Sequence, residues 1–401
     1  MLIDALEKEL SHLDESGLRR ILRVAEGPTN IRQRITDRAG VTKEHLLFCS
    51  NDYLGLASHS KVKEALKEGV DRWGGGSGAS HLISGHTRAH VDLEEKLSAL
   101  YEPFIGMNRC LTFSTGFMAN LAVMTALGGA DAELFSDELN HASLIDGMRL
   151  AKGNVSRFKH KDYVSLEDAL SHSTAEKKII VSDGVFSMDG DLCDGSQLLR
   201  LTEKYDAFVI IDDAHGFGTI GDTGLGTIEY QNIQSNRVIL IGTLSKAAGL
   251  SGAFVIAPRL VIDYLEQVAR SYIYTTASVP ALSYALLASI DIICGDEGVL
   301  LRKKLHKIGE KLFEGLISIK SNQSNLHWRV PKTMTPIQPV VLGDAASTMR
   351  LSIGLENLGF RVPGIRPPTV PQGASRLRIT LSAAHEDSDV DKLLDAMRQL
   401  T

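Results

Sequence analysis

The chain has 401 residues, of which 43% are hydrophobic and 23% are charged, and its formal net charge is −6 at pH 7. This composition predicts an ordinary folded core, and the acidic balance argues against nucleic acid as the main partner. No apolar run approaches the ~18 residues of a membrane helix, and the start, MLIDALEKEL, lacks the basic region of a signal peptide. Because no apolar run has that length, no membrane partner is expected. The four cysteines form no C-x-x-C pair, which fits free thiols in a reducing compartment, here taken as the cytoplasm.

The first 45 residues are charged and are expected to be helical. After them, predicted strands alternate with predicted helices, and most of the strands are continuous apolar runs. Such runs are typical of strands that are covered on both faces, as in a mostly parallel sheet flanked by helices. We expect strands at residues 110–114, 132–136, 178–182, 207–212, 237–242 and 252–257.

The last part of the chain has a different pattern. A strand at 338–342 precedes a helix near 345–357, which Gly359 is expected to end. Residues 376–381 alternate apolar and polar side chains, which predicts a strand with one buried face, and the final residues form an amphipathic helix. We therefore expect an α/β fold with an N-terminal helical segment (1–45), a large domain (46–285) and a smaller C-terminal α+β domain (286–401).

Polar side chains follow five of the predicted strands. Because ligands of open α/β sheets bind outside the carboxyl ends of the strands, these side chains are expected to share one site. In chain order they are Gly116 and Phe117 in a glycine turn, Asp137 and His141, Asp183 and Ser187, Asp212, Asp213 and His215, and Thr243, Ser245 and Lys246.

The residue types in this set indicate one kind of chemistry. The helix start at Gly116 and Phe117 offers backbone N–H groups to a phosphate, and Thr243 can add a hydroxyl. Asp212 can keep a heteroaromatic nitrogen protonated. Lys246, among small side chains, is placed where partial desolvation lowers the pKa of an amine and makes it a nucleophile. A phosphate cup, an anion for a ring nitrogen and a nucleophilic lysine together predict a pyridoxal 5'-phosphate site.

Three other motifs are weaker. GFGTIG (216–221) has dinucleotide-binding spacing, but a glycine-punctuated loop follows it instead of a clean helix, and the acidic residue expected about 20 positions later is missing. His86 and His90 in HTRAH lack the glutamate of a zinc motif and an obvious third ligand, so no metal site is predicted. No G-x-S-x-G motif is present, which disfavours a serine hydrolase.

Seven motifs in order resemble the α-oxoamine synthases, a family of pyridoxal phosphate enzymes with the aspartate aminotransferase fold (fold type I). They are SNDYLGL (50–56), GSGASHLISG (76–85), FSTGFMAN (113–120), NHASLIDG (140–147), DGVFSMDGD (183–191), DDAHGFG (212–218) and GTLSKA (242–247). The resemblance extends from about residue 16 to 395 and departs only slightly, for example in the valine of TTASVPA (275–281).

The resemblance implies a role for each matching residue. Lys246 would form the Schiff base with the cofactor, Asp212 would pair with the ring nitrogen, and His141 would stack on the ring. The other cofactor contacts implied are Ser187 and His215 at the phenolic oxygen, and Gly116, Phe117 and Thr243 at the phosphate. Thr275 and Thr276 would reach the phosphate site of a neighbouring subunit, which implies a homodimer. Arg366 would hold the amino-acid carboxylate, and Arg19, Asn51 and Thr369 would line the substrate site.

Residues 365–385 are most similar to the biotin-pathway branch of the family, which condenses L-alanine with a pimeloyl thioester. A sister synthase that uses glycine, such as a glycine C-acetyltransferase, is an alternative because it would share every cofactor residue. A catalytically silent homologue is disfavoured by the presence of Lys246, Asp212, His141 and His215. The sequence does not decide whether the acyl carrier is coenzyme A or an acyl carrier protein.

Overall fold

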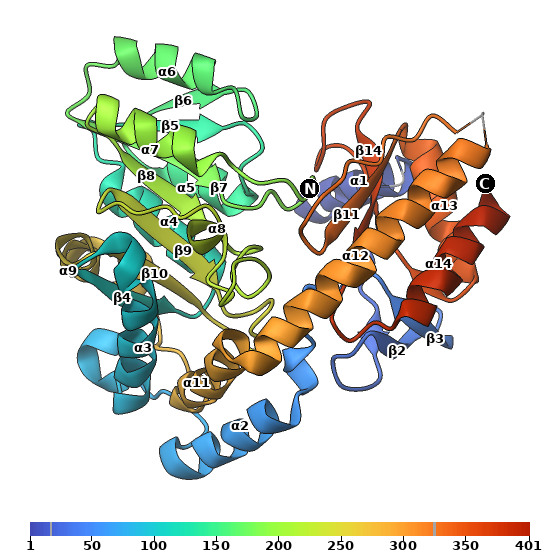
Figure 1. Ribbon diagram of the computed structural model, residues 1–401, viewed down its shortest axis with the longest axis horizontal. Coiled ribbons are helices and arrows are strands. Elements are labelled where there is room, and N and C mark those ends of the chain that lie inside the picture. Colours follow the sequence, from blue (N-terminus) through green and yellow to red (C-terminus); the bar gives the residue numbers. More distant parts are fainter. Residues whose placement is uncertain (17, 324–325) are drawn as a thin grey trace.

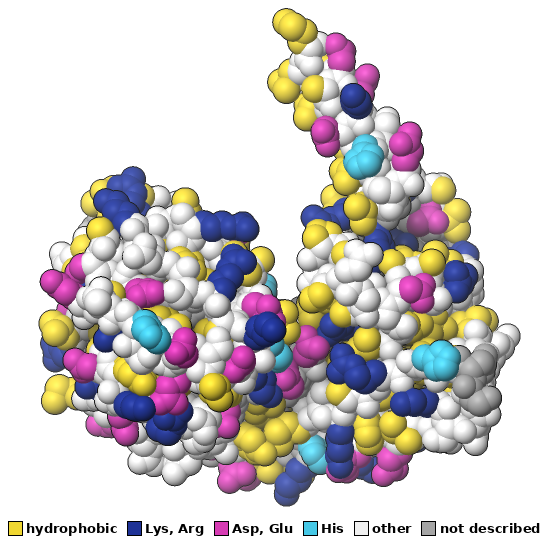
Figure 2. Space-filling model, turned by 90° about the horizontal axis from the view of Figure 1, so that it is seen from above, with side chains coloured by type: hydrophobic (Ala, Val, Ile, Leu, Met, Phe, Trp, Pro, Cys, Tyr) yellow, Lys and Arg dark blue, Asp and Glu magenta, His cyan; other side chains and the backbone are white. Residues whose placement is uncertain are grey.

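The computed structural model of the protein describes residues 1–16, 18–323 and 326–401. Two lobes lie side by side (Figure 1), and the space-filling view shows a hollow between them (Figure 2). The large lobe contains a seven-stranded sheet, and the small lobe contains a three-stranded and a four-stranded sheet. In the described part of the chain, no helix is long and apolar enough to cross a membrane.

The sheet of the large lobe positions the ends of the predicted strands. Its order is β4 (Asn108–Phe113), β10 (Ala253–Pro258), β9 (Val238–Thr243), β8 (Phe208–Asp212), β7 (Lys177–Asp183), β5 (Ala132–Asp137) and β6 (Asn154–Phe158). All of these strands except β10 run in the same direction. The carboxyl ends of β4, β5, β7, β8 and β9 therefore meet at one edge, as the sequence predicts, whereas the edge strand β6 was not predicted.

Both faces of this sheet are buried, which explains its continuous apolar strands. In β9, Val238 and Leu240 pack into one core and Ile239 and Ile241 into the other. The first core also contains residues of α3 (Arg88–Ile105), α6 (Tyr163–His172), α7 (Gly195–Lys204) and α11 (Pro280–Cys294). The second contains residues of α4 (Gly116–Leu127), α5 (Ala142–Leu150), α9 (Arg259–Val268) and α10 (Arg270–Ile273). The remaining helical segments of the lobe are η1 (Leu56–Ser58), α2 (Ser60–Trp73), the π-helical turn η2 (His81–Gly85) and α8 (Thr227–Tyr230).

The long helix α12 (Asp296–Asn322) runs from the large lobe along the small one (Figure 1). The small lobe adds the sheet β11 (Ile337–Gly343), β14 (Ser375–Thr380) and β13 (Gly364–Ile365), with helices α13 (Ala345–Asn357) and α14 (Asp387–Leu400). Helix α11 crosses the boundary predicted at 285–286 and packs against α2 and α3 of the large lobe. The exact limits of the domains stay a prediction.

The expectation of an entirely helical N-terminal segment is wrong. Helix α1 covers only Leu2–Glu15, has no buried residue and projects from the body of the molecule (Figure 2). Strands β1 (Val24–Ala25), β2 (Arg32–Thr36) and β3 (Thr42–Leu47) follow it, and β3 pairs in parallel with β12 (Phe360–Arg361) of the small lobe. The N-terminal strands are thus part of a sheet that a distant segment completes.

The prediction of one exposed face for residues 376–381 is also wrong, because every residue of β14 is buried. The two arginines of this strand reach across to the large lobe. Arg376 donates to Asp189 Oδ1 (2.6 Å), and Arg378 Nε donates to the carbonyl oxygen of Ser187 (2.5 Å). Pairing with these acceptors allows the guanidinium groups to be buried.

Candidate active site

Lys246 lies in the turn that follows β9, beside the other strand ends. Gly249 makes this turn possible, because its φ is +72° and a Cβ atom there would lie 2.4 Å from the backbone nitrogen of Ala57. The Lys246 amine is 2.8 Å from His215 Nε2. Burial lowers the pKa of this amine to about 8, although the negative charges of Asp212 and Asp183 act in the opposite direction. The lysine is therefore able to act as a nucleophile and a base near neutral pH.

Asp212 ends β8 with its carboxylate held by two donors. Oδ1 accepts from the backbone nitrogen of Ala214 (3.0 Å), and Oδ2 accepts from Asn120 Nδ2 in α4 (2.6 Å). Asp212 is 6% exposed and borders the same cavity as Lys246. Its neighbour Asp213 has a structural role, because it accepts the backbone N–H and the hydroxyl of Thr227 at the start of α8.

His215 lies between Lys246 and a buried tyrosine. Burial, followed by the positive charge of Lys246, holds the pKa of His215 well below its usual value, so the imidazole is neutral. The Tyr53 hydroxyl lies 2.6 Å from His215 Nδ1 and donates to Asn51 Oδ1 (3.1 Å). With that hydroxyl proton committed to Asn51, Nδ1 carries the imidazole proton and Nε2 accepts from the Lys246 amine.

His141 is the N-cap residue of α5, and its ring borders the cavity. Nδ1 accepts from the backbone nitrogen of Ser143 (3.3 Å) and lies 2.6 Å from the Ser143 hydroxyl oxygen. Partial burial and the charge of Lys246 lower the pKa of His141, against the influence of Asp212. The imidazole is therefore neutral near pH 7.

The cavity that joins these residues has a volume of about 170 Å³ and ends at the start of α4. Gly116 and Phe117 form the first turn of this helix, and a Cβ atom on Gly116 would lie 3.8 Å from Thr243 Oγ1. Free backbone N–H groups, a threonine hydroxyl and space beside a glycine fit a phosphate. The opposite residues, Asp212 and Lys246, fit the ring nitrogen and the aldehyde of pyridoxal phosphate.

The remaining predicted site residues lie outside this cavity. Ser187 and Thr369 line an adjoining opening, which also borders on His141. Asn51 is exposed beside Tyr53, and Arg366 is half-buried with Nη1 3.0 Å from Met349 Sδ. Neither Arg19, which pairs with Asp14 (2.6 Å), nor Thr275 and Thr276, which follow α10, lines either opening.

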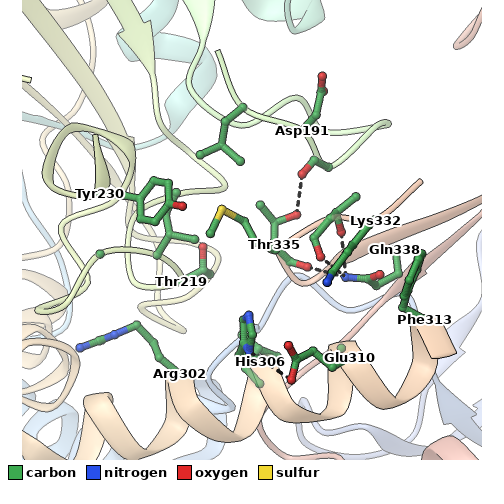
Figure 3. Close-up of a pocket in the computed structure, with 18 of the residues that line it drawn as sticks. Asp191, Thr219, Tyr230, Arg302, His306, Glu310, Phe313, Lys332, Thr335 and Gln338 are labelled. Atoms are coloured by element: carbon green, nitrogen blue, oxygen red, sulfur yellow. Dashed lines mark hydrogen bonds and ion pairs between the residues drawn. The ribbon is translucent and has the colours of Figure 1, made fainter. Parts of the chain in front are cut away.

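A larger cavity of about 550 Å³ lies between the lobes, along α12 (Figure 3). Two of its polar side chains stabilise the junction of the lobes: the buried Arg302 donates to the carbonyl oxygens of Ile293 and Asp222 (2.7 Å each), and Thr335 donates to the carbonyl oxygen of Gly190 (2.9 Å). His306 and Glu310 pair with each other along the helix (3.7 Å). The described residues lining this cavity do not include the predicted cofactor residues, so we place the active site at the smaller cavity.

The two competing motifs are accounted for by packing. Each glycine of 216–221 is closely packed: a Cβ atom on Gly216 would lie 2.0 Å from the Asp213 carboxylate, one on Gly218 2.5 Å from the Cβ atom of Ala247, and one on Gly221 2.1 Å from the Glu229 carboxylate. His86 and His90 stack on each other, and His90 Nε2 lies 2.9 Å from the carbonyl oxygen of Ser278. No group of three metal-ligating side chains was found in residues 1–16, 18–323 and 326–401.

Sequence reasoning did not single out three side chains that organise the site: Tyr53, Asn120 and Ser143. Each lies inside one of the seven motifs. However, each acts through contacts with other elements, and these contacts become visible only in the folded chain.

Fold and site together define an enzyme of fold type I that depends on pyridoxal phosphate. The chain belongs to the family of class I and II aminotransferases, whose model matches residues 43–397. Over its whole length it is similar to proteins named 8-amino-7-oxononanoate synthase: it is 50% identical to that of Leptothrix cholodnii, with 99% of this chain and 98% of the relative covered, and 48% identical to that of Polaromonas naphthalenivorans, with 100% and 98% covered.

Solved structures agree with this assignment. A serine palmitoyltransferase of Sphingomonas wittichii superposes with a TM-score of 0.88 at 28% identity, covering 99% of this chain and 96% of that one. A related serine palmitoyltransferase from S. paucimobilis, at 26% identity and the same TM-score and coverage, carries a PLP–myriocin aldimine. The 8-amino-7-oxononanoate synthase of Francisella tularensis matches with a TM-score of 0.74 at 30% identity, covering 88% of this chain and 97% of that one. The expected fold class and cofactor are confirmed.

Proposed function

We propose that the protein condenses L-alanine with a pimeloyl thioester to give 8-amino-7-oxononanoate, carbon dioxide and the free carrier thiol, a step in biotin biosynthesis. The observation that carries the proposal is the meeting of Lys246, Asp212, His141 and the start of α4 at one cavity. The choice of substrates rests on the names of relatives that are 47–50% identical over nearly the whole chain. The same names disfavour the glycine-dependent alternative.

When bound, pyridoxal phosphate supplies a cationic ring that withdraws electrons from the Cα atom of an amino acid. Asp212 would hold the ring nitrogen, and Gly116, Phe117 and Thr243 would bind the phosphate. His215 and Ser187 would contact the phenolic oxygen, and His141 would lie against the ring. In this role, the hydrogen bonds that fix Asp212 and His215 orient them before the cofactor arrives.

Lys246 has two tasks in this proposal. Its nitrogen would hold the cofactor at rest, and with alanine bound the free amine would accept the Cα proton of alanine and later return a proton to the product. A pKa of about 8 leaves a useful fraction of the amine neutral at pH 7 to 8, which such a base needs. Arg366 would hold the alanine carboxylate, and Arg19, Asn51 and Thr369 would line the substrate site.

Product analysis tests the substrate assignment directly. The purified enzyme with pimeloyl-CoA and L-alanine should form 8-amino-7-oxononanoate and release one carbon dioxide per free thiol. Parallel reactions with glycine and L-serine test the sister activities, and reactions with pimeloyl-acyl carrier protein identify the carrier. Faster turnover of glycine than of alanine with every acyl thioester would refute the proposal.

We also propose that the enzyme works as a cytoplasmic homodimer in which Thr275 and Thr276 serve the phosphate site of the neighbouring subunit. Two observations support this arrangement: the residues that line the cavity do not include Thr275 or Thr276 of the same chain, and α1 exposes its apolar side chains. Mixing the inactive variants K246A and T275A/T276A tests it, since hybrid dimers would contain one intact site. Recovery of activity is expected, and none would be recovered if each chain built its own site.

A further inference from the structure

Asn120 lines the cavity and connects two of the proposed cofactor residues, Asp212 directly and His141 through Ser143. It lies in α4, is 2% exposed, and uses both hydrogens of its amide nitrogen: one bonds Asp212 Oδ2 (2.6 Å) and the other bonds Ser143 Oγ (2.7 Å). Asp212 comes from the end of β8 and Ser143 from the first turn of α5. A single side chain thus joins three elements at the point where the cofactor ring is expected.

The orientation of the amide follows from its neighbours. Exchanging the amide nitrogen and oxygen would bring Oδ1 to 2.6 Å from a carboxylate oxygen, and two acceptors repel each other at that distance. In the observed orientation Oδ1 is buried without a hydrogen-bond partner among the described residues. Asn120 therefore satisfies Asp212 and Ser143 and leaves its own acceptor unpaired, which packing alone would not favour.

Through its contact with Ser143, Asn120 also determines which nitrogen of His141 is protonated. Because Ser143 Oγ accepts from Asn120, its own proton is free to be donated to His141 Nδ1, which is 2.6 Å away. The backbone nitrogen of Ser143 donates to the same atom (3.3 Å). Two donors at Nδ1 leave the proton of a neutral imidazole on Nε2.

We infer that Asn120 is a positioning residue for the reaction. It fixes the carboxylate of Asp212 for the ring nitrogen and, through Ser143, holds His141 as the Nε2–H tautomer. The inference rests on the proposed function, because it assigns Asn120 to the pyridoxal phosphate site. A hydrogen bond to an ionised group is among the stronger ones in proteins, so the contact with Asp212 is the more important of the two.

The contacts of Asn120 with Asp212 and with Ser143 are tested separately by measuring cofactor affinity and turnover in two variants. Asn120→Leu keeps the approximate volume but removes both donors, so the dissociation constant of pyridoxal phosphate, titrated into the full-length protein stripped of cofactor, should rise by about tenfold or more, and kcat should fall by a similar factor. Ser143→Ala leaves the bond to Asp212 intact. It should keep the dissociation constant within about threefold while lowering kcat by about fivefold or more.

Thr125→Val is the matched control, since it removes a hydroxyl of the same helix. Among the described residues, this hydroxyl bonds carbonyl oxygens of α4, those of Leu121 (2.6 Å) and Ala122 (3.5 Å). This substitution should leave both quantities within about twofold of wild type. If Asn120→Leu does not fold, Asn120→Ala, which introduces no clash, tests the role of Asn120 by the same two measurements. Wild-type affinity in the folded Asn120 variant, with only a lower melting temperature, would reduce Asn120 to a packing residue and overturn the inference. Failure of the wild-type enzyme to use alanine would instead refute the proposed function.

Discussion

Replacing Lys246 by methionine should stabilise the cofactor-free protein at neutral pH, and the gain should disappear in alkali. The pKa of the Lys246 amine is lowered by burial from 10.5 to about 8 in the folded state. The charged amine is less stable in the folded state than in the unfolded state, so it lowers the free energy of unfolding of wild type below pH 8. This loss of stability diminishes as the pH rises from 8 to 10.5. At about 1.36 kcal/mol for each pH unit between the two values, the full penalty is about 3 kcal/mol.

Urea unfolding of both proteins at pH 7 and pH 10, at one protein concentration, measures this effect. The free energy of unfolding of K246M relative to wild type should fall by about 2 to 3 kcal/mol between the two pH values. Comparing pH values cancels the constant difference in packing between the two side chains. The exposed Lys63 provides the control, because K63M should show no such pH dependence. An equal difference between K246M and wild type at pH 7 and pH 10 would refute the reasoning.

Three further outcomes are expected. Asp212→Asn should lower kcat by about 100-fold or more while the protein still binds pyridoxal phosphate, and nearly intact turnover would contradict the role of this carboxylate. Gly249→Ala should lower the free energy of unfolding by about 2 to 5 kcal/mol, because a Cβ atom at φ +72° would overlap the adjacent backbone; urea unfolding measures it, and an unchanged value would contradict the strain argument. Burial alone would lower the pKa of His160, but hydrogen bonds to Asp137 and Asp191 raise it to about 9. The stabilisation is therefore complete below about pH 6.5 and is lost as the pH rises through 9, so H160Q should be most destabilising, by thermal melting, in acid and least in alkali.

The central sheet could be predicted because its strands are buried on both faces and are therefore continuously apolar. The strand β6 was not predicted, because it lies at the edge of the sheet and most of its side chains are exposed. The charged strands β2 and β3 carry no such signal. Their pairing depends on each other and on β12, a partner too distant in sequence for any local pattern to reveal.

The site was predictable to the extent that it follows from strand ends. Lys246, Asp212, His215 and His141 come together because parallel strands end at one edge. Residues that act across elements were not predictable in this way. The burial of Arg376 in β14, which the alternating pattern had placed on an exposed face, likewise depends on acceptors in the other lobe.

The pairing of β3 with β12 has a consequence for how the chain is made. Strand β3 leaves the ribosome early, while the segment that completes its sheet is synthesised roughly 300 residues later, a delay of roughly 15 to 60 seconds at about 5 to 20 residues per second. During that time, the edge of β3 to which β12 will later bind has no partner strand, so its backbone groups are exposed. The large lobe is complete before the small lobe, so the newest part of the chain closes a sheet begun by the oldest. Chaperones that bind exposed strands would therefore find their substrate near the N-terminus of the nascent chain.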